Sequence, residues 1–384
     1  MVKKRRILYL LNSRNYYGAK RHFTSFMEYA DFDLMDFTVI SLKDNFPDHV
    51  RKSLKRIKFQ EYNFPELNTW FKWVKFLWGK KPHQIIFAES GITDFNWLAT
   101  FAAWLVAKGN VYMQEYSTVP TNLKGYRKLF RLIPNLGLWN NSLSIRTLFC
   151  KRVLVCSNGV KEKLIRYYFY PPQKIDIAHC PLDSEKFSPR QGYSFEMRNR
   201  YGILAADVVC IVTSRLVKMK AVDTVIAAFT MLINVSKRKD IWLWILGDGP
   251  LRTELNCLVE RNGIGQRVIF LGFQNDVEKY LQESDIFILA SEFEAFSIAL
   301  LEALSVGLVC VTTPTDGSKE AMQDKGFIVE HTAESIFNCL LGIVNMNRDE
   351  IEEMKRKARR YILDGSDKAE EAKRNLKALA IPSI

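Results

Sequence analysis

The amino-acid sequence predicts an α/β protein built from two parallel-sheet domains, and three observations support this. The chain has 384 residues, which is long for one hydrophobic core and comfortable for two domains of ordinary size. In each half, short apolar runs of strand character alternate with helical patterns, as in parallel sheets covered by helices on both faces. Between the halves, residues 181–193 contain two prolines and one glycine without sustained apolar periodicity, so we place the domain boundary there.

The first half begins with a strand, a polar loop and a helix. Gly18 lies at this strand-to-helix junction, where a backbone without Cβ lets a ligand come close. The basic segment 51–58 is interpreted as a solvated helix face. The apolar runs predict strands at 6–11, 37–42, 84–88, 111–114, 152–156 and 175–180.

The second half repeats the alternation. Strands are predicted at 208–214, 241–247, 268–271, 286–290 and 308–312, with helices between them. A charged helix at 348–362 follows, and then a polar tail. We therefore expect a basic first domain over residues 1–186, a second domain over 187–363, and a tail, 364–384, that packs back across the domain boundary.

Composition narrows the class of protein. A hydrophobic content of 48% with 25% charged residues is typical of a soluble globular chain. The apolar run 7–11 is too short for a signal peptide, and 97–107 is too short to span a bilayer, so a cytoplasmic protein is expected. The seven cysteines are scattered without a CxxC, which indicates reduced core residues, and the dispersed histidines offer no metal-ligand spacing.

The positive charge is concentrated in the first half. Residues 1–180 hold 29 Lys and Arg against 13 Asp and Glu, whereas residues 181–384 hold 26 against 29. Such asymmetry indicates that the first half faces an anionic partner, for which a membrane surface, an acidic glycan and nucleic acid are the candidates. The dispersed basic residues form no recognisable nucleic-acid reading module, so nucleic acid is not the partner we expect.

The segment 69–81 has two interpretations. It combines three tryptophans with four lysines, a composition that suits an interfacial membrane helix. Its Trp70, Trp73, Val74 and Leu77 also form an i, i+3, i+4, i+7 stripe, as in a helix packed on a sheet, and we favour this second interpretation. Residues 121–152, of mixed basic, aromatic and apolar character, are a candidate acceptor or membrane contact.

The stretch 286–303 is the most informative in the chain. An apolar strand run is followed by a polar break with Glu294 and then by a helix that carries Glu302. This strand, loop and helix start form the kind of place where α/β sheets bind phosphorylated ligands. The carboxylates lie about two helical turns apart and could grip one elongated ligand. The alternative is that Glu294 only complements a helix dipole and that Glu302 is a solvated surface charge. The sequence neighbours of Glu302, however, are apolar.

Several segments together resemble glycosyltransferase family 4, the retaining nucleotide-sugar enzymes with the GT-B fold. Glu294 and Glu302 match the E-x7-E element of that family, and residues 214–223, with Arg215 and Lys220, resemble its G-R-L…K-G-V-D segment. Residues 247–250 match its GDGP turn, 270–285 its base-binding loop and helix, 316–320 its G-G-x-x-E loop, and 180–189 its interdomain segment. The first half resembles the family only through Gly18 and the general alternation.

The resemblance implies a fold of two Rossmann-like, doubly wound parallel-sheet domains facing across a cleft. It also implies roles. Arg215 and Lys220 would hold the donor diphosphate and neutralise the charge that grows on the leaving phosphate, with Glu294 as the third catalytic residue, binding sugar hydroxyls. The remaining donor-site residues would be Gly18, Gly247, Leu271, Phe273, Ala295, Phe296, Ser297, Ile298 and Glu302. Among these, the backbone N–H groups of residues 296–298 would face the sugar or phosphate, and Glu302 would accept hydrogen bonds from the ribose.

The sequence also departs from the family pattern. Gln114 stands where the family has a histidine before a glutamate. A glutamine hydrogen-bonds a sugar hydroxyl but cannot relay a proton at neutral pH. Small residues replace several family glycines, so close approach of a ligand is retained, although the Cβ of Ala295 narrows the sugar pocket.

The function that follows is a retaining, metal-independent hexosyltransferase. It would move a sugar from a nucleotide-diphosphate sugar to a lipid-linked or cell-surface glycan acceptor, with the departing phosphate taking the acceptor proton. No cofactor is expected. The chain would be cytoplasmic and peripheral at the inner face of the membrane, with an anionic membrane surface as a candidate partner. The alternative is a non-catalytic binding or partner subunit on the same fold, motivated by Gln114 and the replaced glycines.

Overall fold

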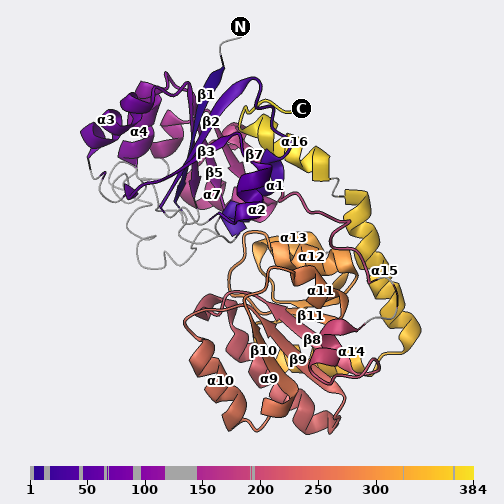
Figure 1. Ribbon diagram of the computed structural model, residues 1–384. Coiled ribbons are helices and arrows are strands. Elements are labelled where there is room, and N and C mark those ends of the chain that lie inside the picture. Colours follow the sequence, from indigo (N-terminus) through magenta and orange to yellow (C-terminus); the bar gives the residue numbers. More distant parts are fainter. Residues whose placement is uncertain are drawn as a thin grey trace, which may run out of the picture. The chain divides into compact units, whose positions relative to one another are not determined.

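A computed structural model describes residues 4–12, 18–42, 46–64, 67, 69–89, 97–116, 145–190, 192, 195–322, 324–365 and 368–384. The chain divides into two compact units (Figure 1). The first comprises Met1–Pro181 together with Lys368–Ile384, and the second comprises Leu182–Asp367. The C-terminal segment therefore returns to the unit that contains the N-terminus. The predicted contact region 121–152 lies largely outside the described residues.

The first unit is organised around a seven-stranded sheet in the order β3-β2-β1-β4-β5-β6-β7. All neighbouring strands run parallel. The strands are β1 (Arg5–Asn12), β2 (Met35–Ser41), β3 (Ile57–Glu61), β4 (Gln84–Glu89), β5 (Val111–Glu115), β6 (Arg152–Val155) and β7 (Ile175–Ile177).

Helices cover both faces of this sheet (Figure 1). On one face, Ile7, Tyr9 and Leu11 of β1 pack against Phe23 and Leu376 in a single apolar cluster. The helices that contribute to this cluster are α1 (Gly18–Met27), α2 (Asp48–Ser53) and α16 (Lys368–Ala378). The other face is covered by α3 (Trp70–Lys80) and α4 (Trp97–Val106), which lie side by side. Helix α7 (Asn158–Tyr168) packs along β6 and β7, and the short 3-10 turns are η3 (Thr147–Phe149) and η4 (Pro172–Lys174).

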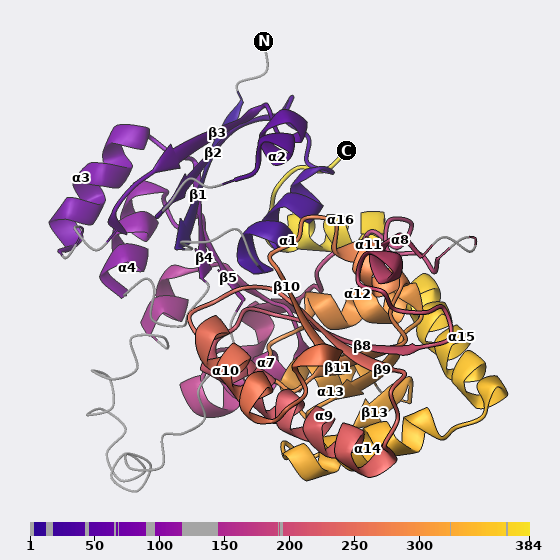
Figure 2. The same ribbon diagram turned by 60° about the horizontal axis from the view of Figure 1, so that its bottom comes forward.

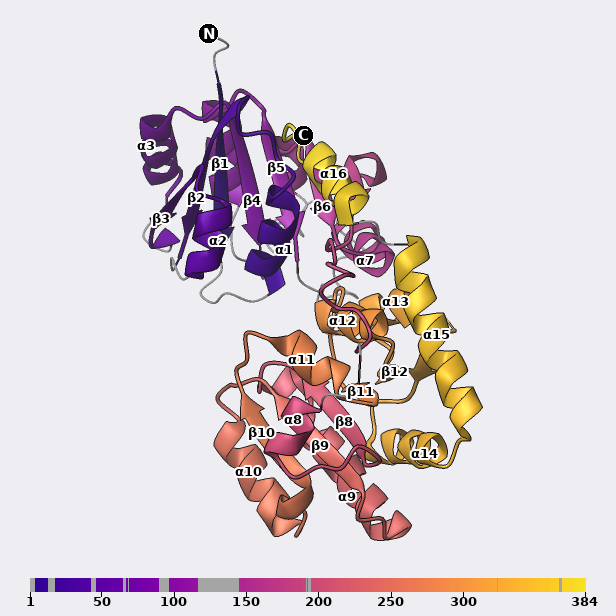
Figure 3. The same ribbon diagram turned by 45° about the vertical axis from the view of Figure 1, so that its right-hand side comes forward.

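The second unit has a six-stranded parallel sheet in the order β10-β9-β8-β11-β12-β13 (Figure 3). Its strands are β8 (Val208–Thr213), β9 (Ile241–Leu246), β10 (Val268–Gly272), β11 (Ile286–Leu289), β12 (Val309–Thr312) and β13 (Gly326–Ile328). The central strands β11 and β12 are apolar along nearly their whole length and fully buried, because both of their faces are covered by helices.

Two apolar clusters flank the second sheet. One is formed with α9 (Val222–Ser236), α10 (Arg252–Arg261) and α14 (Ala333–Val344). The other is formed with α8 (Glu196–Arg200), α11 (Val277–Gln282), α12 (Ile298–Val306), α13 (Asp316–Met322) and α15 (Arg348–Gly365). The remaining short turns are η5 (Lys218–Lys220) and η6 (Gly265–Arg267). Figure 2 shows the same helices around the sheet from a second direction.

Several elements were not predicted from the sequence, namely strands β3 and β13 and helices α7, α8, α13, α14 and α16. Strand β3 has charged and polar residues and buries only Ile57, and β13 has three residues, so neither gives a clear apolar run. The segment predicted as a polar tail contains helix α16, whose sequence is strongly charged. The α/β alternation and the parallel sheets were predicted correctly in both halves.

Candidate functional site

The strand order of the second sheet marks one place where a ligand is expected. In chain order, β8, β9 and β10 extend the sheet in one direction, and β11, β12 and β13 extend it in the other. In such sheets ligands bind at the carboxyl ends of the strands where the order reverses. Here the reversal lies between β8 and β11, so the loops 214–221 and 290–297 form this place.

These two loops are joined by an ion pair. Lys220, at the end of η5, donates from Nζ to Oε1 of Glu294. The side chains of Lys220 and Glu294 are 13% and 15% exposed, so the pair is held near the surface and is not sealed in the core. The backbone N–H of Glu292 donates to the carbonyl of Met219 at 2.9 Å, which fixes the loops to each other. The structure thus brings together two of the three predicted catalytic residues.

Glu294 has further partners within its own unit. The hydroxyl of Ser291 donates to Oε1 of Glu294 at 3.1 Å, and the N–H of Gly317 donates to the Glu294 carbonyl at 3.3 Å. Thr313 donates from Oγ1 to the Ser291 carbonyl at 2.7 Å. Ser291 therefore orients the carboxylate, while Gly317 and Thr313 hold the backbone of its loop. We did not predict Ser291 or Thr313, although a serine at the end of an apolar strand is a usable signal.

Glycines let the loops approach one another. Gly247 has φ 138°, and a Cβ at this position would lie 1.8 Å from the Ser214 carbonyl oxygen. A Cβ on Gly317 would lie 2.4 Å from Cα of Phe296. These positions require glycine because real Cβ atoms do not approach backbone atoms so closely. Gly247, predicted only as a donor-site residue, is thus required by the packing of this unit's own backbone.

Helix α12 begins at the Glu294 loop. Ser297 is its N-cap and accepts a hydrogen bond from the Leu300 N–H at 3.3 Å. Ala295 and Ser297 are buried, whereas Phe296 and Ile298 are half-buried. Glu302 lies farther along the same helix and is 2% exposed. A helix N-terminus with its unpaired N–H groups and positive dipole end suits an anionic ligand.

Three other predicted residues lie in the Lys220 loop, in strand β10 and just after that strand. Arg215 is exposed in the same loop as Lys220. The N–H of Leu216 donates to the Asp248 carbonyl at 2.9 Å, which brings the turn after β9 beside this loop. Leu271 is 7% exposed and packs in the core, whereas Phe273 is 53% exposed. Of Leu271 and Phe273, only Phe273 thus offers a side-chain surface to a ligand.

Two predicted residues belong to the first unit. Gly18 is the first residue of α1, and a Cβ added there would meet nothing within 4 Å, so the chain's own packing does not require glycine. Gln114, at the end of β5, is 1% exposed. Its Oε1 accepts a hydrogen bond from the Tyr9 hydroxyl at 2.7 Å, whereas its Nε2 has no hydrogen-bond partner among the residues that the structure describes.

Two tyrosine hydroxyls lie beside Gln114. The Tyr9 hydroxyl also lies 3.0 Å from that of Tyr116. Burial raises the pKa of both phenols well above its usual range, so both are protonated donors at neutral pH. With its oxygen occupied by Tyr9, Gln114 presents an amide N–H pair. The next residue, Glu115, is buried, and its Oε1 lies 3.7 Å from Nη2 of the buried Arg146.

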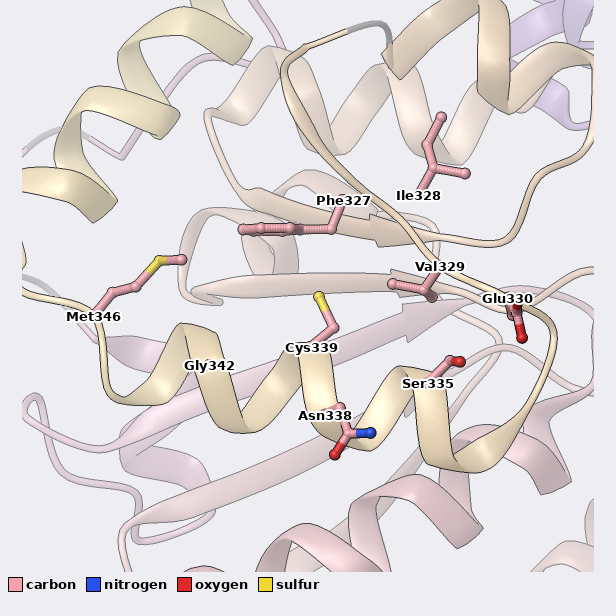
Figure 4. A pocket seen from close by; sticks show the side chains of 9 residues that line it. All are labelled: Phe327, Ile328, Val329, Glu330, Ser335, Asn338, Cys339, Gly342 and Met346. Atoms are coloured by element: carbon pink, nitrogen blue, oxygen red, sulfur yellow. The ribbon is translucent and has the colours of Figure 1, made fainter.

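A groove runs along the edge of the second sheet, between β13 and α14. In Figure 4, Phe327 and Val329 lie over Cys339, and Glu330 and Ser335 lie together at one end. Burial raises the pKa of Cys339 to about 12, so its thiol is protonated. The lining residues are Phe327, Ile328, Val329, Glu330, Ser335, Asn338, Cys339, Gly342 and Met346. None of them is a predicted site residue, and we do not assign this groove to the donor.

Comparison with known proteins shows what the chain is similar to. Residues 194–361 match the model of the family "Glycosyl transferases group 1". The chain is 35% identical over 162 residues to N-acetyl-alpha-D-glucosaminyl L-malate synthase of Bacillus anthracis, a match of 42% of this chain and 41% of that protein. It is 28% identical over 308 residues, 77% of this chain and 78% of the other, to a Campylobacter jejuni N-acetylgalactosaminyltransferase named for a diacetylbacillosaminyl-diphospho-undecaprenol substrate.

A third relative is an Escherichia coli alpha-1,3-galactosyltransferase named for UDP-Gal and alpha-D-GlcNAc-diphosphoundecaprenol. It is 29% identical over 51% of this chain and 52% of its own length. The chain therefore spans about half or less of the Bacillus and Escherichia proteins.

Solved structures extend the likeness to the whole chain. HepE of Anabaena in complex with UDP has a TM-score of 0.77 at 16% identity and covers 98% of this chain and 99% of its own. WaaG, a glycosyltransferase involved in lipopolysaccharide biosynthesis, has a TM-score of 0.73 at 17% identity, with the same coverage of each chain, 98% and 99%. Within the described residues, no helix has both the length and the apolar character needed to cross a membrane. Residues 194–361 therefore belong to the glycosyl transferases group 1, and the chain has the GT-B fold that its sequence predicted.

Proposed function

We propose that this chain is a retaining glycosyltransferase that moves a sugar from a nucleotide-diphosphate sugar to a lipid-linked or cell-surface glycan acceptor. The observation that carries the proposal is the Lys220–Glu294 pair at the reversal point of the second sheet. Support comes from relatives named for diphosphoundecaprenol-linked sugars and from HepE, a structure in complex with UDP.

The pair can serve both parts of a sugar nucleotide at once. A lysine ammonium has three N–H donors, and Lys220 uses one of them on Glu294. The others are available to diphosphate oxygens. Oε1 of Glu294 accepts from Lys220 and Ser291, which leaves its second oxygen to accept from sugar hydroxyls. Arg215 in the same loop would add a second cation at the diphosphate.

The proposed reaction is a substitution on one face of the sugar. The bond between the anomeric carbon and the diphosphate oxygen breaks, and a bond to the acceptor hydroxyl oxygen forms on the same face. The acceptor proton passes to the departing diphosphate. Lys220, Arg215 and the N-terminus of α12 lower the barrier by stabilising negative charge as it grows on the leaving group.

Gln114 and Gly18, in the first unit, are the other predicted donor-binding residues. The Tyr9 hydroxyl occupies the Gln114 oxygen, so the amide N–H pair would donate to a sugar hydroxyl. It cannot take up a proton at neutral pH, which agrees with a mechanism in which the substrate's own phosphate takes the proton. Gly18 leaves room for the donor phosphates.

Metal independence is part of the proposal, since Lys220 and Arg215 would supply the positive charge at the diphosphate. Activity of the purified protein should then survive an excess of EDTA. Loss of turnover on chelation, with recovery on adding magnesium, would remove this part while leaving the transfer reaction in place. The enzyme would work in the cytoplasm, at the inner face of the membrane.

A donor screen tests the proposal. Thermal unfolding is followed with UDP-, GDP- and ADP-sugars, because a ligand that binds only the native state raises the melting temperature. Release of nucleoside diphosphate is then measured with the donor that binds. Lys220→Ala and Glu294→Ala should each lower turnover by at least about a hundredfold, from the loss of one charge-stabilising group.

Lys218→Ala is the matched control, since Lys218 is an exposed lysine on the same 3-10 turn. It should leave turnover unchanged. A complete donor panel that gives neither a thermal shift nor release of diphosphate would contradict the proposal.

The alternative is a non-catalytic partner subunit on the same fold, favoured by Gln114 in place of a proton-relaying histidine. Complementation of a strain lacking the protein separates the two. Full cellular function of the Glu294→Ala and Arg215→Ala variants would favour the partner subunit, whereas loss of function in both supports the enzyme.

A further inference from the structure

Helix α4 presents its large apolar side chains to solvent. Its buried residues are Ala99, Thr100, Ala102 and Ala103. On the opposite side, Trp97, Trp104 and Leu105 are 39%, 40% and 42% exposed. A surface helix of a soluble protein normally buries its large apolar residues and exposes polar ones. Helix α4 does the opposite: it buries small residues against the sheet and exposes large apolar ones. Packing on the sheet does not explain the exposed residues.

The neighbouring helix α3 has a similar outer side. Its packing stripe was predicted correctly, with Trp73 and Leu77 buried. The spacing i, i+4, i+7 also places Phe71, Lys75 and Trp78 together on the solvent side, where both aromatic residues are 66% exposed. The two interpretations of this segment are therefore compatible, because different sides of one helix satisfy them.

The outer sides of α3 and α4 join into one surface. The ring centroids of Phe71 and Trp70 lie 3.7 Å apart, and those of Trp70 and Phe101 of α4 lie 6.4 Å apart. The ring centroid of Phe101 lies 5.1 Å from that of Phe149 of η3. The residue before Phe149, Leu148, is 70% exposed. We call this surface the aromatic face; its exposed members are Phe71, Trp78, Trp97, Trp104, Leu105 and Leu148.

The charge around the aromatic face has one sign. Residues 69–81 and 97–108 contain five lysines and no aspartate or glutamate. All five lysines, at positions 72, 75, 80, 81 and 108, are exposed. A surface buried against another folded chain seldom keeps so many lysines, which are depleted from protein interfaces. Exposed aromatic residues among lysines instead match the interfacial region of a bilayer with anionic headgroups.

We infer that the aromatic face docks on an anionic lipid bilayer, with its aromatic side chains in the headgroup region and its lysines on the lipid charges. The inference rests on the proposed function only in that a lipid-linked acceptor would lie at such a surface. Neither the exposed aromatic side chains nor the lysines alone would give stable binding to a bilayer. Apolar insertion of a few side chains and electrostatic attraction to anionic lipid add up to stable but reversible binding.

Vesicle flotation with the full chain tests this without any nucleotide sugar. Vesicles of phosphatidylcholine alone are compared with vesicles containing about one-third phosphatidylglycerol, a level at which each basic residue contributes measurably. The wild type should float with the anionic vesicles and much less with the neutral ones. Binding should weaken as salt is raised, because the charge contribution is screened.

Two variants separate the contributions. The triple variant Phe71→Ser, Trp78→Ser, Leu148→Ser should weaken binding to anionic vesicles by at least about tenfold, from the loss of inserted apolar area. Lys75→Gln should weaken it about fivefold, the effect of one basic residue near the surface. The matched controls in the second unit are Leu204→Ser, at a leucine 68% exposed, and Lys239→Gln, at an exposed lysine. Both should bind like the wild type.

Each other outcome overturns the inference. Absence of flotation with either vesicle, or equal loss in the control variants, would do so. Dimerisation of the wild type that the triple variant abolishes, without vesicle binding, would assign the aromatic face to a second copy of the chain. Donor-induced thermal shifts are measured without vesicles, so failure of the proposed transfer reaction would be seen separately.

Discussion

At the scale of single residues, Gly247 fixes the positions of the loops that follow β8, β9 and β10. Its φ of 138° and the 1.8 Å that would separate a Cβ from the Ser214 carbonyl oxygen leave no room for a side chain. The N–H of Gly247 also donates to the Gly272 carbonyl at 2.8 Å. We predict that Gly247→Ala lowers the free energy of unfolding by at least about 3 kcal/mol, as expected for backbone strain combined with a steric clash.

Gly263→Ala is the control for Gly247. Gly263 also has positive φ, at 67°, but a Cβ there would meet nothing within 4 Å. Only the conformational strain remains, and a loss of about 1 kcal/mol is expected. Urea denaturation of both variants checks the difference. Equal losses would show that the contact with Ser214 does not constrain the loop.

The residues of the candidate site differ in how far the sequence could predict them. Glu294 stands in a local motif, and the resemblance added Lys220, but their direct pairing joins positions 74 residues apart. The Tyr9–Gln114 hydrogen bond spans 105 residues, and no local pattern contains it. Residue types at a site can be predicted from spacing, whereas the partners that orient them depend on strand order.

At the scale of elements, α16 docks on the first unit through a buried polar cluster. The Asn375 side chain donates to the His179 carbonyl at 2.9 Å, and its oxygen lies 3.0 Å from Nε2 of His22 on α1. Glu371 accepts a hydrogen bond from the His179 N–H. We predicted that this tail packs back across the domain boundary but not that it forms a helix, because so highly charged a segment resembles a solvated tail. Its few buried residues are recognised only against α1.

This cluster gives a pH dependence. Burial lowers the pKa of His22 from 6.5 to about 4, against the hydrogen bond with Asn375, which raises it. The folded state therefore binds its proton less readily than the unfolded chain. The stability from neutral His22 is fully present above about pH 6.5 and is lost as the pH falls towards 4. Between about pH 7.5 and pH 5 the loss is about 2 kcal/mol.

Urea denaturation at these two pH values measures the effect of His22. Other groups also titrate over this range, so the comparison is with His22→Gln, which keeps a polar side chain but has no proton to bind. The wild type should lose about 2 kcal/mol more than this variant on acidification. An identical pH dependence in the two proteins would mean that His22 is not held neutral by burial.

At the scale of the whole molecule, the two units repeat one strand order. Both sheets begin with a central strand, add two strands on one side and continue on the other. The alternation of apolar runs predicted this architecture because parallel strands buried on both faces must be apolar. The edge strands β3 and β13 escaped prediction for the same reason, since an edge position leaves part of a strand exposed.

The division into units also makes a prediction. Helices α15 and α16 are consecutive in the chain, yet Ile362 of α15 packs in the second unit and Leu376 of α16 in the first, and both are 0% exposed. Each truncation to alanine should cost about 3 kcal/mol, from lost burial and the cavity left behind. Leu376→Ala should destabilise the first unit and Ile362→Ala the second.

Native-state hydrogen exchange, followed on peptides from β1 and from β8, reads the stability of the two units separately. Leu376→Ala should speed exchange in β1 far more than in β8, and Ile362→Ala should do the opposite. The two variants serve as controls for each other, because each removes the same kind of contact from neighbouring helices. If both variants speed exchange equally in the two strands, the chain unfolds as a single cooperative body, and α16 does not belong to the first unit alone.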